Sequence, residues 1–333
     1  MKAPFPYFGG KSTVADKIWK ALGNPKHYIE PFFGSGATLL LRPDYNQKMI
    51  ETVNDKDGFI SNVWRSLKFS PEATAEVCDY PINHADLSAR KKHLIENEKH
   101  LLENLIKDDK WHDVELAGYW IWAASCWIGS GLTSPTKLNK IPDISHAGKG
   151  VHAIGKIPHI GHAGKGVHAI GKIPHIGKKG MGVHRKSVNI YKWFNDLSFR
   201  LRRVRVVCGD WTRVCGGNWQ DNIGVCGMFF DPPYGVTDRS EDIYHHDSAT
   251  IAVDVMEWVK IRGENKKYRI VLTGYEEYSE LVENYGWTSE NWKAQGGYGK
   301  TGKEKSRGKE NCKREMIYYS PHCLPSKQQQ TLF

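Results

Sequence analysis

Short apolar runs alternate with segments of helical spacing toward both ends of the chain. Runs of this length predict buried strands, and they occupy residues 27–30, 48–53, 204–208, 225–230, 268–272 and 316–319. Patterns typical of helices lie between them, over residues 11–22, 58–68, 188–203, 249–259 and 277–285. Because strands and helices alternate, we expect an α/β fold with a largely parallel sheet, whose ligands bind at the carboxyl ends of the strands.

Residues 71–128 interrupt this alternation with a mostly helical pattern. They include a charged stretch over residues 90–110 and an aromatic stretch over residues 119–122. We therefore expect a helical insertion, in which the aromatic side chains form a helix core rather than stacking platforms.

An internal repeat follows, in which residues 146–161 (HAGKGVHAIGKIPHIG) recur unchanged as 162–177. Its glycines and its proline exclude a long regular helix and predict an extended loop or a short array of β-hairpins. Seven histidines lie between His146 and His184. They have no i,i+4 spacing on a predicted helix and no accompanying acids, so we expect no metal site and favour phosphate contacts by lysines and backbone N–H groups.

The net charge of the 333-residue chain is +10 at pH 7, and it is unevenly distributed. Residues 137–186 carry ten Lys or Arg and one acid, Asp143, while residues 296–314 carry seven Lys or Arg and two glutamates. Charge this local favours a polyanionic partner, most often nucleic acid. A solvated loop without a partner is the alternative for either stretch.

Composition argues against several other classes of protein. No run of about 18 apolar residues predicts a membrane span, and residues 1–6 lack the apolar stretch of a signal peptide. The seven cysteines form no C-x-x-C pair, so we expect free thiols in a reducing compartment, no zinc site and a cytoplasmic protein. No G-x-G-x-x-G motif opens a helix, which argues against a nicotinamide dehydrogenase.

The segment Asp231-Pro232-Pro233-Tyr234 ends the apolar run over 225–230 and has the composition of a small rigid platform. Its prolines fix two φ angles and donate no N–H, so their carbonyl groups can accept from a ligand. The carboxylate is a second acceptor, and the tyrosine offers a stacking face. Two acceptors beside an aromatic ring suit a planar base with an exocyclic amino group, such as adenine or cytosine. The alternative is a plain turn between a strand and a loop.

Four more motifs lie in order with this segment, at residues 6–11 (PYFGGK), 30–36 (EPFFGSG), 54–55 (ND) and 209–211 (GDW). The set resembles the Dam-type (D12 class, alpha-group) DNA N6-adenine methyltransferases, especially phage-borne members, over residues 4–68 and 188–320. The resemblance implies a Rossmann-like S-adenosylmethionine-dependent methyltransferase sheet. It also implies a catalytic domain over 1–68 and 188–320, an insertion for DNA recognition over 69–187 and a flexible tail over 321–333.

The resemblance assigns roles to individual residues. The catalytic residues would be Asp231, Pro232, Pro233 and Tyr234. The residues that bind S-adenosylmethionine would be Tyr7, Lys11, Glu30, Pro31, Phe32, Gly34, Gly36, Asp55, Asp210 and Trp211.

Physical chemistry is consistent with these cofactor roles. The Lys11 ammonium can pair with the methionyl carboxylate, and Gly34 and Gly36 let the backbone approach the cofactor closely. Asp55 ends a strand, where a carboxylate can accept from both ribose hydroxyls. Alternatives are a surface position for Lys11, a helix N-cap for Asp55 and a core position for Trp211.

The expected reaction transfers a methyl group from S-adenosylmethionine to N6 of an adenine flipped out of the DNA stack. The ring would stack on Tyr234, and its amino group would donate to Asp231 and to the Pro232 carbonyl group. Cytosine N4 and adenine in RNA are alternative acceptors, with the aspartate of the platform favouring adenine in this family. A non-catalytic DNA-binding protein that keeps the fold is the alternative of another class.

Target recognition departs from the better-known Dam enzymes, because the repeat occupies the region of their recognition elements. Lysines and backbone groups bind phosphate without reading bases, so we expect relaxed sequence specificity. The predicted DNA contacts are Lys149, Lys156, Lys165, Lys172, Lys178, Lys179 and Arg185.

The end of the chain, Gln329–Phe333 (QQTLF), resembles the Q-x-x-L-F peptide that docks bacterial DNA-processing proteins on the replication sliding clamp. An unstructured tail without a partner is the alternative. The sequence leaves the oligomeric state open, with a monomer as the simplest expectation.

Overall fold

A computed structural model of the protein describes residues 1–5, 10–46, 48–82, 84–126, 132–133, 189–217, 222, 224–233, 250–292 and 315–325. The chain forms two compact units. One, here called the α/β unit, comprises Met1–Ala3, Tyr7–Ser61 and Leu201–Phe333. The other, here called the helical unit, comprises Pro4–Pro6 and Asn62–Arg200.

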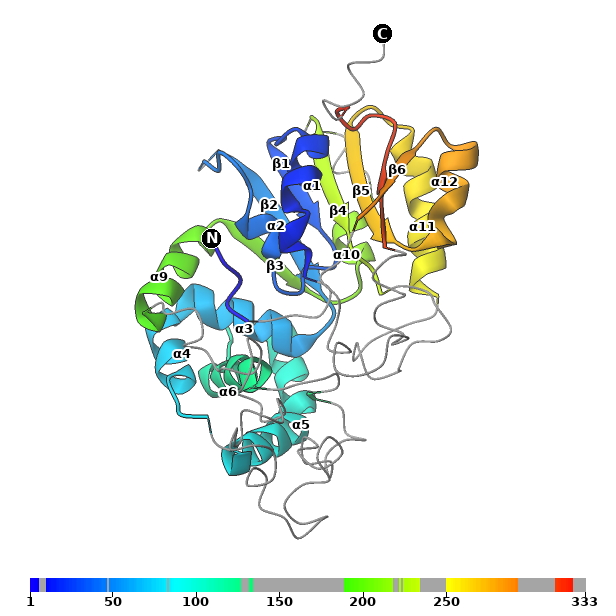
Figure 1. Ribbon diagram of the computed structural model, residues 1–333. Helices are drawn as coiled ribbons and strands as arrows, with labels where there is room; N and C mark the ends of the chain where they lie inside the picture. Colours follow the sequence, from blue (N-terminus) through cyan, green and yellow to red (C-terminus); the bar gives the residue numbers. More distant parts are fainter. Residues whose placement is uncertain are drawn as a thin grey trace, which may run out of the picture. The chain divides into compact units, whose positions relative to one another are not determined.

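The described residues of the α/β unit contain a seven-stranded sheet of order β3-β2-β1-β4-β5-β7-β6 (Figure 1). Its strands are β1 (His27–Glu30), β2 (Ile50–Asp55), β3 (Val204–Cys208), β4 (Cys226–Phe230), β5 (Tyr268–Gly274), β6 (Thr288–Asn291) and β7 (Met316–Tyr319). The first five strands pair in parallel, and β7 runs antiparallel to both β5 and β6. The prediction of a largely parallel α/β sheet is therefore confirmed.

Helices cover both faces of this sheet. The turn η1 (Lys11–Thr13) leads into α1 (Ala15–Leu22), which packs against β4 and β5. On the other face, the apolar side chains of α10 (Thr212–Cys215), α11 (Ile251–Gly263) and α12 (Ser279–Asn284) share one core with alternate residues of β4 and β5. The other short elements among the described residues of this unit are α2 (Ala37–Leu40) and η5 (Glu276–Tyr278).

The two sides of β5 follow from the period of two in a strand. Tyr268, Ile270 and Leu272 belong to the core that contains α11. Arg269 points to the other face, where its guanidinium donates to the Leu22 carbonyl oxygen at the end of α1 over 2.8 Å. The odd-numbered residues of β5 therefore lie on the α1 face.

The strand order changes direction between β1 and β4, which are neighbours with the register His27↔Cys226. In open α/β sheets, ligands bind in the crevice at such a switch point, outside the carboxyl ends of the strands. The fold therefore places the segments after Glu30 and Phe230 at the position where a ligand is expected.

The helical unit consists, among its described residues, of most of α3 (Gly58–Phe69), of α4 (Pro71–Cys78), α5 (His84–Lys107) and α6 (Val114–Cys126), and of α9 (Ile190–Leu201) up to Arg200. The mostly helical pattern over 71–128 correctly predicted α4, α5 and α6. Trp120 and Trp122 are 6% and 0% exposed, so the expectation of a helix core for the aromatic stretch is correct for both.

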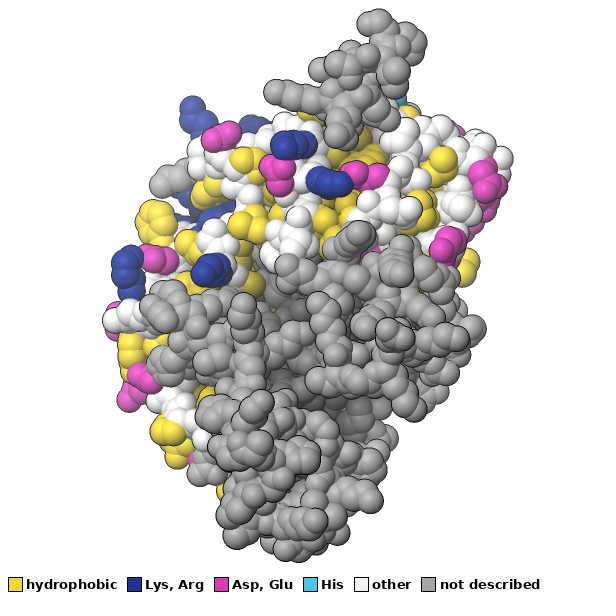
Figure 2. All heavy atoms as spheres, in the orientation of Figure 1, with side chains coloured by type: hydrophobic (Ala, Val, Ile, Leu, Met, Phe, Trp, Pro, Cys, Tyr) yellow, Lys and Arg dark blue, Asp and Glu magenta, His cyan; other side chains and the backbone are white. Residues whose placement is uncertain are grey.

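Some predictions concern residues outside the described ranges. They are Tyr7, Tyr234, the repeat with Lys149, Lys156, Lys165, Lys172, Lys178, Lys179 and Arg185, and the tail Gln329–Phe333. Both strongly basic stretches lie there as well. On the described part of the face in Figure 2, Lys and Arg side chains lie among Asp and Glu side chains rather than in one patch. In the described ranges, no helix combines the length and the apolar character needed to cross a membrane.

Candidate active site

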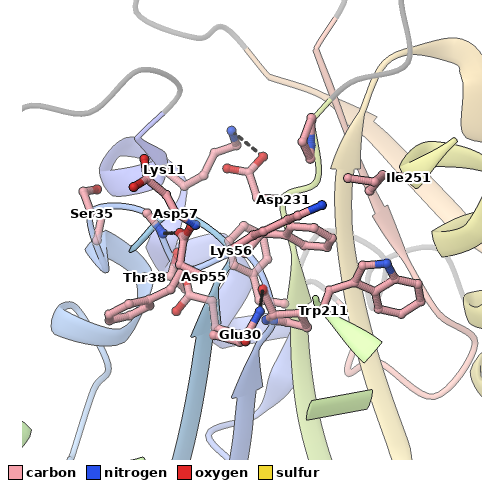
Figure 3. A pocket seen from close by; sticks show the side chains of 18 of the residues that line it. Lys11, Glu30, Ser35, Thr38, Asp55, Lys56, Asp57, Trp211, Asp231 and Ile251 are labelled. Atoms are coloured by element: carbon pink, nitrogen blue, oxygen red, sulfur yellow. Dashed lines mark hydrogen bonds and ion pairs between the residues drawn. The ribbon is translucent and has the colours of Figure 1, made fainter. Parts of the chain in front are cut away.

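A cavity of about 840 Å³, counted to its open mouth, lies at the carboxyl ends of β1, β2, β3 and β4 (Figure 3). Each of these strands is followed by residues that line it. The lining residues are Gly10, Lys11, Glu30, Pro31, Phe32, Phe33, Gly34, Ser35, Ala37, Thr38, Asn54, Asp55, Lys56, Asp57, Gly209, Asp210, Trp211, Phe229, Asp231, Pro233 and Ile251.

The loop after β1 turns through two glycines in the left-handed region. Gly34 has φ +48° and Gly36 has φ +63°, a conformation that costs glycine little because it has no Cβ. The Gly34 N–H donates to Oδ2 of Asp55 over 2.7 Å. The loop is therefore held against the end of β2, with its backbone along the cavity wall.

Asp55 organises the end of β2. Its Oδ1 accepts the N–H of Asp57 over 2.9 Å, while Oδ2 accepts that of Gly34. Burial, and next the nearby Asp57 carboxylate, raise the pKa of Asp55 to about 7. The helix N-cap, which was the alternative role for Asp55, is instead provided by Asp57. Its side chain accepts the N–H of Phe59 at the start of α3 over 2.8 Å.

Asn54 joins two of the loops that line the cavity. Its Nδ2 donates to the carbonyl oxygens of Pro31 and Gly209, each over 3.0 Å. Asn54 is 1% exposed, and its Oδ1 is buried without a hydrogen-bond partner among the described residues. A buried amide oxygen without a hydrogen bond has lost its contact with water and gained none in return. A hydrogen-bond donor on a ligand would offset that cost.

Two further lining residues are buried. Glu30 is 2% exposed and accepts the Tyr28 hydroxyl over 2.8 Å, and burial raises its pKa well above the ordinary value. Trp211 is 5% exposed and packs edge-to-face on Phe230 with ring centroids 6.1 Å apart. Trp211 is therefore both a core residue and part of the cavity wall.

Asp231 lies directly after β4 and receives two donors on one oxygen. Oδ1 is 2.8 Å from the Lys11 ammonium and 2.7 Å from the Thr273 hydroxyl, and Figure 3 shows Lys11 directed at this carboxylate. Lys11 is 2% exposed and Asp231 is 19% exposed. The Lys11 ammonium also lies 5.6 Å from the ring centroid of the buried Trp292.

The cavity brings together most of the described residues that the sequence singled out. Lys11, Glu30, Pro31, Phe32, Gly34, Asp55, Asp210, Trp211, Asp231 and Pro233 line it. Gly36 and Pro232 are not among the lining residues. Sequence reasoning missed the lining residues Thr38, Lys56, Asp57, Phe229 and Ile251, which belong to no motif that it used. It also missed Thr273, which contacts Asp231 without lining the cavity. Among the described residues, no group of His, Cys, Asp or Glu side chains could hold a metal ion.

The fold and the cavity together define a Rossmann-like α/β protein with a cavity at the switch point of its sheet. Residues 7–128 match the family of D12 class N6 adenine-specific DNA methyltransferases. The chain therefore carries a domain of this family over these residues. The resemblance to the D12 class that was inferred from the motifs is confirmed over residues 7–128.

The match has two consequences for the site. It covers the glycine loop and the ends of β1 and β2, whereas Asp231 and Trp211 lie outside it. It also favours adenine N6 over cytosine N4, which the sequence had left open. A comparison with curated proteins found no match.

Proposed function

We propose that the protein transfers a methyl group from S-adenosylmethionine to N6 of an adenine in DNA, with the cofactor in the described cavity and the adenine at Asp231. One observation carries the proposal. The predicted acceptor of the amino group, Asp231, lines the same cavity as the glycine loop and Asp55. S-adenosylmethionine, which donates the methyl group, and adenine, which receives it, can thus meet at one switch point of the sheet.

The lining of the cavity fits S-adenosylmethionine. Gly34 lets the backbone approach a ligand, Trp211 and Phe32 offer apolar faces for the adenine ring, and Asp55 offers a carboxylate for the ribose. The unpartnered Oδ1 of Asn54 also fits a ligand with N–H or O–H groups. When bound, the cofactor supplies an electrophilic methyl group on a sulfonium.

The platform after β4 would act on the target base. Asp231 and the Pro232 carbonyl oxygen accept the two N–H groups of N6, which directs the nitrogen lone pair toward the methyl group. With the cofactor bound, the N6–carbon bond would form as the sulfur–carbon bond breaks, sulfur would keep the electron pair, and N6 would release one proton to water. The Asp231 carboxylate offsets the positive charge that develops on N6.

The test uses labelled S-adenosylmethionine, duplex DNA and digestion to nucleosides. We expect label in N6-methyl-2′-deoxyadenosine from the wild type. In Asp231→Ala, we expect a loss of about 10²- to 10³-fold in rate, the usual effect of removing one preorganised electrostatic partner, with cofactor binding by calorimetry retained. Transfer at a rate near that of the wild type, with cofactor binding intact, would contradict the assignment of Asp231.

We further propose that the repeat and the residues after it contact DNA phosphates, through Lys149, Lys156, Lys165, Lys172, Lys178, Lys179 and Arg185. Contacts of this kind position the enzyme without reading bases, so specificity is relaxed. Sequencing of methylated DNA after expression tests this. Methylation spread over many sequence contexts is expected, and a single strict target motif would refute it.

The tail Gln329–Phe333 is proposed to dock on the replication sliding clamp. Its two terminal apolar residues, Leu332 and Phe333, would fill a hydrophobic groove. The chain without residues 329–333 should lose retention on immobilised clamp while its methyl transfer to short duplexes is unchanged. Equal retention of both chains would contradict the proposal.

A further inference from the structure

Thr273 belongs to no motif of the sequence, yet its side chain contacts the predicted catalytic carboxylate. It lies in β5 and is 0% exposed. Its hydroxyl is 2.7 Å from Oδ1 of Asp231 and 3.3 Å from the Phe230 carbonyl oxygen. A hydroxyl has one hydrogen to donate, and the shorter distance and the charged acceptor favour Asp231.

The strand gives this hydroxyl a rigid mount. β5 is an inner strand, paired in parallel with β4 through Leu272↔Phe230 and antiparallel with β7 through Thr273↔Ile317. The pairing with β4 on one side and β7 on the other therefore fixes the backbone of β5 around Thr273. A β-branched side chain is also restricted at χ1, so little conformational freedom remains to the hydroxyl.

Both described donors to Asp231 act on the same oxygen and come from the same side of the sheet. Thr273 is an odd-numbered residue of β5, and these lie on the α1 face, as Arg269 does. Lys11 belongs to η1, which directly precedes α1. Two bonds to Oδ1 of 2.7 and 2.8 Å limit rotation of the carboxylate about its Cβ–Cγ bond.

We propose that Thr273 is a positioning residue for methyl transfer, which fixes the orientation of the Asp231 carboxylate toward the amino group of the target base. This inference rests on the proposed function, because it assigns to Asp231 the role given there. Lys11 places a positive charge beside the same oxygen. Thr273 donates a hydrogen bond whose direction is fixed by the position of Thr273 in the sheet. Misorientation of a reacting group by about 1 Å costs up to about 10²-fold in rate.

The test compares Thr273→Val, which removes the hydroxyl at similar volume, with Thr273→Ser, which keeps it. We expect kcat for DNA methylation to fall about 10- to 100-fold in Thr273→Val. The dissociation constant for S-adenosylmethionine should stay within about twofold of the wild type, since Thr273 does not line the cavity. Thr273→Ser should recover most of the lost rate.

A matched control is Thr74→Val in α4. Thr74 is also 0% exposed, and its hydroxyl donates to the Ser70 carbonyl oxygen over 2.7 Å. This variant loses a comparable buried hydrogen bond in the helical unit, so its melting temperature should fall while its kcat stays near that of the wild type.

A double-mutant cycle shows whether Thr273 acts through Asp231. In an Asp231→Asn background, the further change Thr273→Val should cost less than about threefold, because residues that act as a unit are not additive. A full additional loss would contradict the inference, as would a single Thr273→Val variant with wild-type kcat. If Thr273→Val does not fold, Thr273→Ala replaces it against the same Thr273→Ser reference. A wild type that methylates no adenine would contradict the proposed function itself.

Discussion

The Lys11 ammonium lies 2.8 Å from Oδ1 of Asp231, and the lysine is 2% exposed. Burial of an ammonium is costly unless a partner compensates it, so the pair joins the N-terminal turn to the segment after β4. The family resemblance had assigned this lysine to the methionyl carboxylate of the cofactor. The ion pair supports a different first role, in which Lys11 is the partner of the Asp231 carboxylate beside the cavity.

The variant Lys11→Met separates these two roles. If the ammonium acts mainly on Asp231, kcat falls about 10²-fold, as for loss of one preorganised charge, and the dissociation constant for S-adenosylmethionine rises less than about threefold. Calorimetry and single-turnover methylation measure the two quantities. An increase in the dissociation constant larger than the loss in kcat would favour the methionyl carboxylate instead.

Lys17→Met is the control for Lys11→Met. Lys17 pairs with Glu290 over 2.6 Å, but the two side chains are 46% and 40% exposed. Exposed pairs contribute at most about 1 kcal/mol to stability, so both kcat and cofactor binding should remain unchanged.

Asn54→Ala should loosen the cavity. The variant loses the donor to the Pro31 and Gly209 carbonyl oxygens, and partly buried acceptors left without a donor cost about 1 to 3 kcal/mol each. We expect a dissociation constant for S-adenosylmethionine at least about tenfold higher, which corresponds to about 1.4 kcal/mol. Calorimetry measures this directly.

The helical unit offers a matched control for Asn54. Asn62 is 0% exposed, its Nδ2 donates to the Asp113 carbonyl oxygen over 2.8 Å, and its Oδ1 accepts the Asp113 N–H over 2.8 Å. Asn62→Ala should lower the melting temperature by about as much as Asn54→Ala does. It should change the affinity for S-adenosylmethionine less than about twofold. Equal effects of both variants on affinity would contradict a specific role for Asn54.

The affinity for the cofactor should depend on pH through Asp55. Its pKa of about 7 lies above the value of 3.8 for an unperturbed aspartate. Asp55 therefore contributes stability that is complete below about pH 4 and is lost as the pH rises through about 7. If the carboxylate accepts a ribose hydroxyl, the dissociation constant should rise about tenfold as the pH falls from 8 to 6, because one pH unit below the pKa leaves about a tenth of the group ionised.

The variant Asp57→Asn identifies the group that titrates. Burial is the main cause of the raised pKa of Asp55, and the Asp57 carboxylate is the next. Removal of that charge should move the midpoint of the binding profile to lower pH, while asparagine can still cap α3. Titration of the ligand is common to both proteins and cancels in the comparison. An unchanged midpoint would exclude Asp55 as the titrating group.

The local pattern of apolar and polar residues predicted most of the fold, because most helices and strands have an apolar run or a helical spacing within their own sequence. The four residues of β1 and the five of β3 are bounded as predicted. The strand β6 was missed, because its sequence Thr-Ser-Glu-Asn is polar and it pairs only with β7 at the edge of the sheet. The position of β7 between β5 and β6 also has no local signal, since strand order depends on contacts that are distant in sequence.

The residues of the candidate site also fall into those that the sequence predicted and those that only the structure revealed. Glu30, Asp55 and Asp231 were assigned to the site because they belong to motifs of the family resemblance. Each also ends a predicted strand, where ligand-binding residues of parallel sheets gather. Thr273 was missed because it meets Asp231 only through the pairing of β4 and β5, 42 positions further along the chain. For Trp211, pattern offered a core position or a cavity wall, and the structure combines them.

The most direct test of the account is the product formed on DNA by the wild type and by Asp231→Ala, each first shown by calorimetry to bind S-adenosylmethionine. The account predicts N6-methyl-2′-deoxyadenosine as the labelled nucleoside from the wild type, and a rate about 10²- to 10³-fold lower from the variant at similar cofactor affinity. Label in N4-methyl-2′-deoxycytidine, or an Asp231→Ala variant that methylates adenine at the wild-type rate, would contradict it.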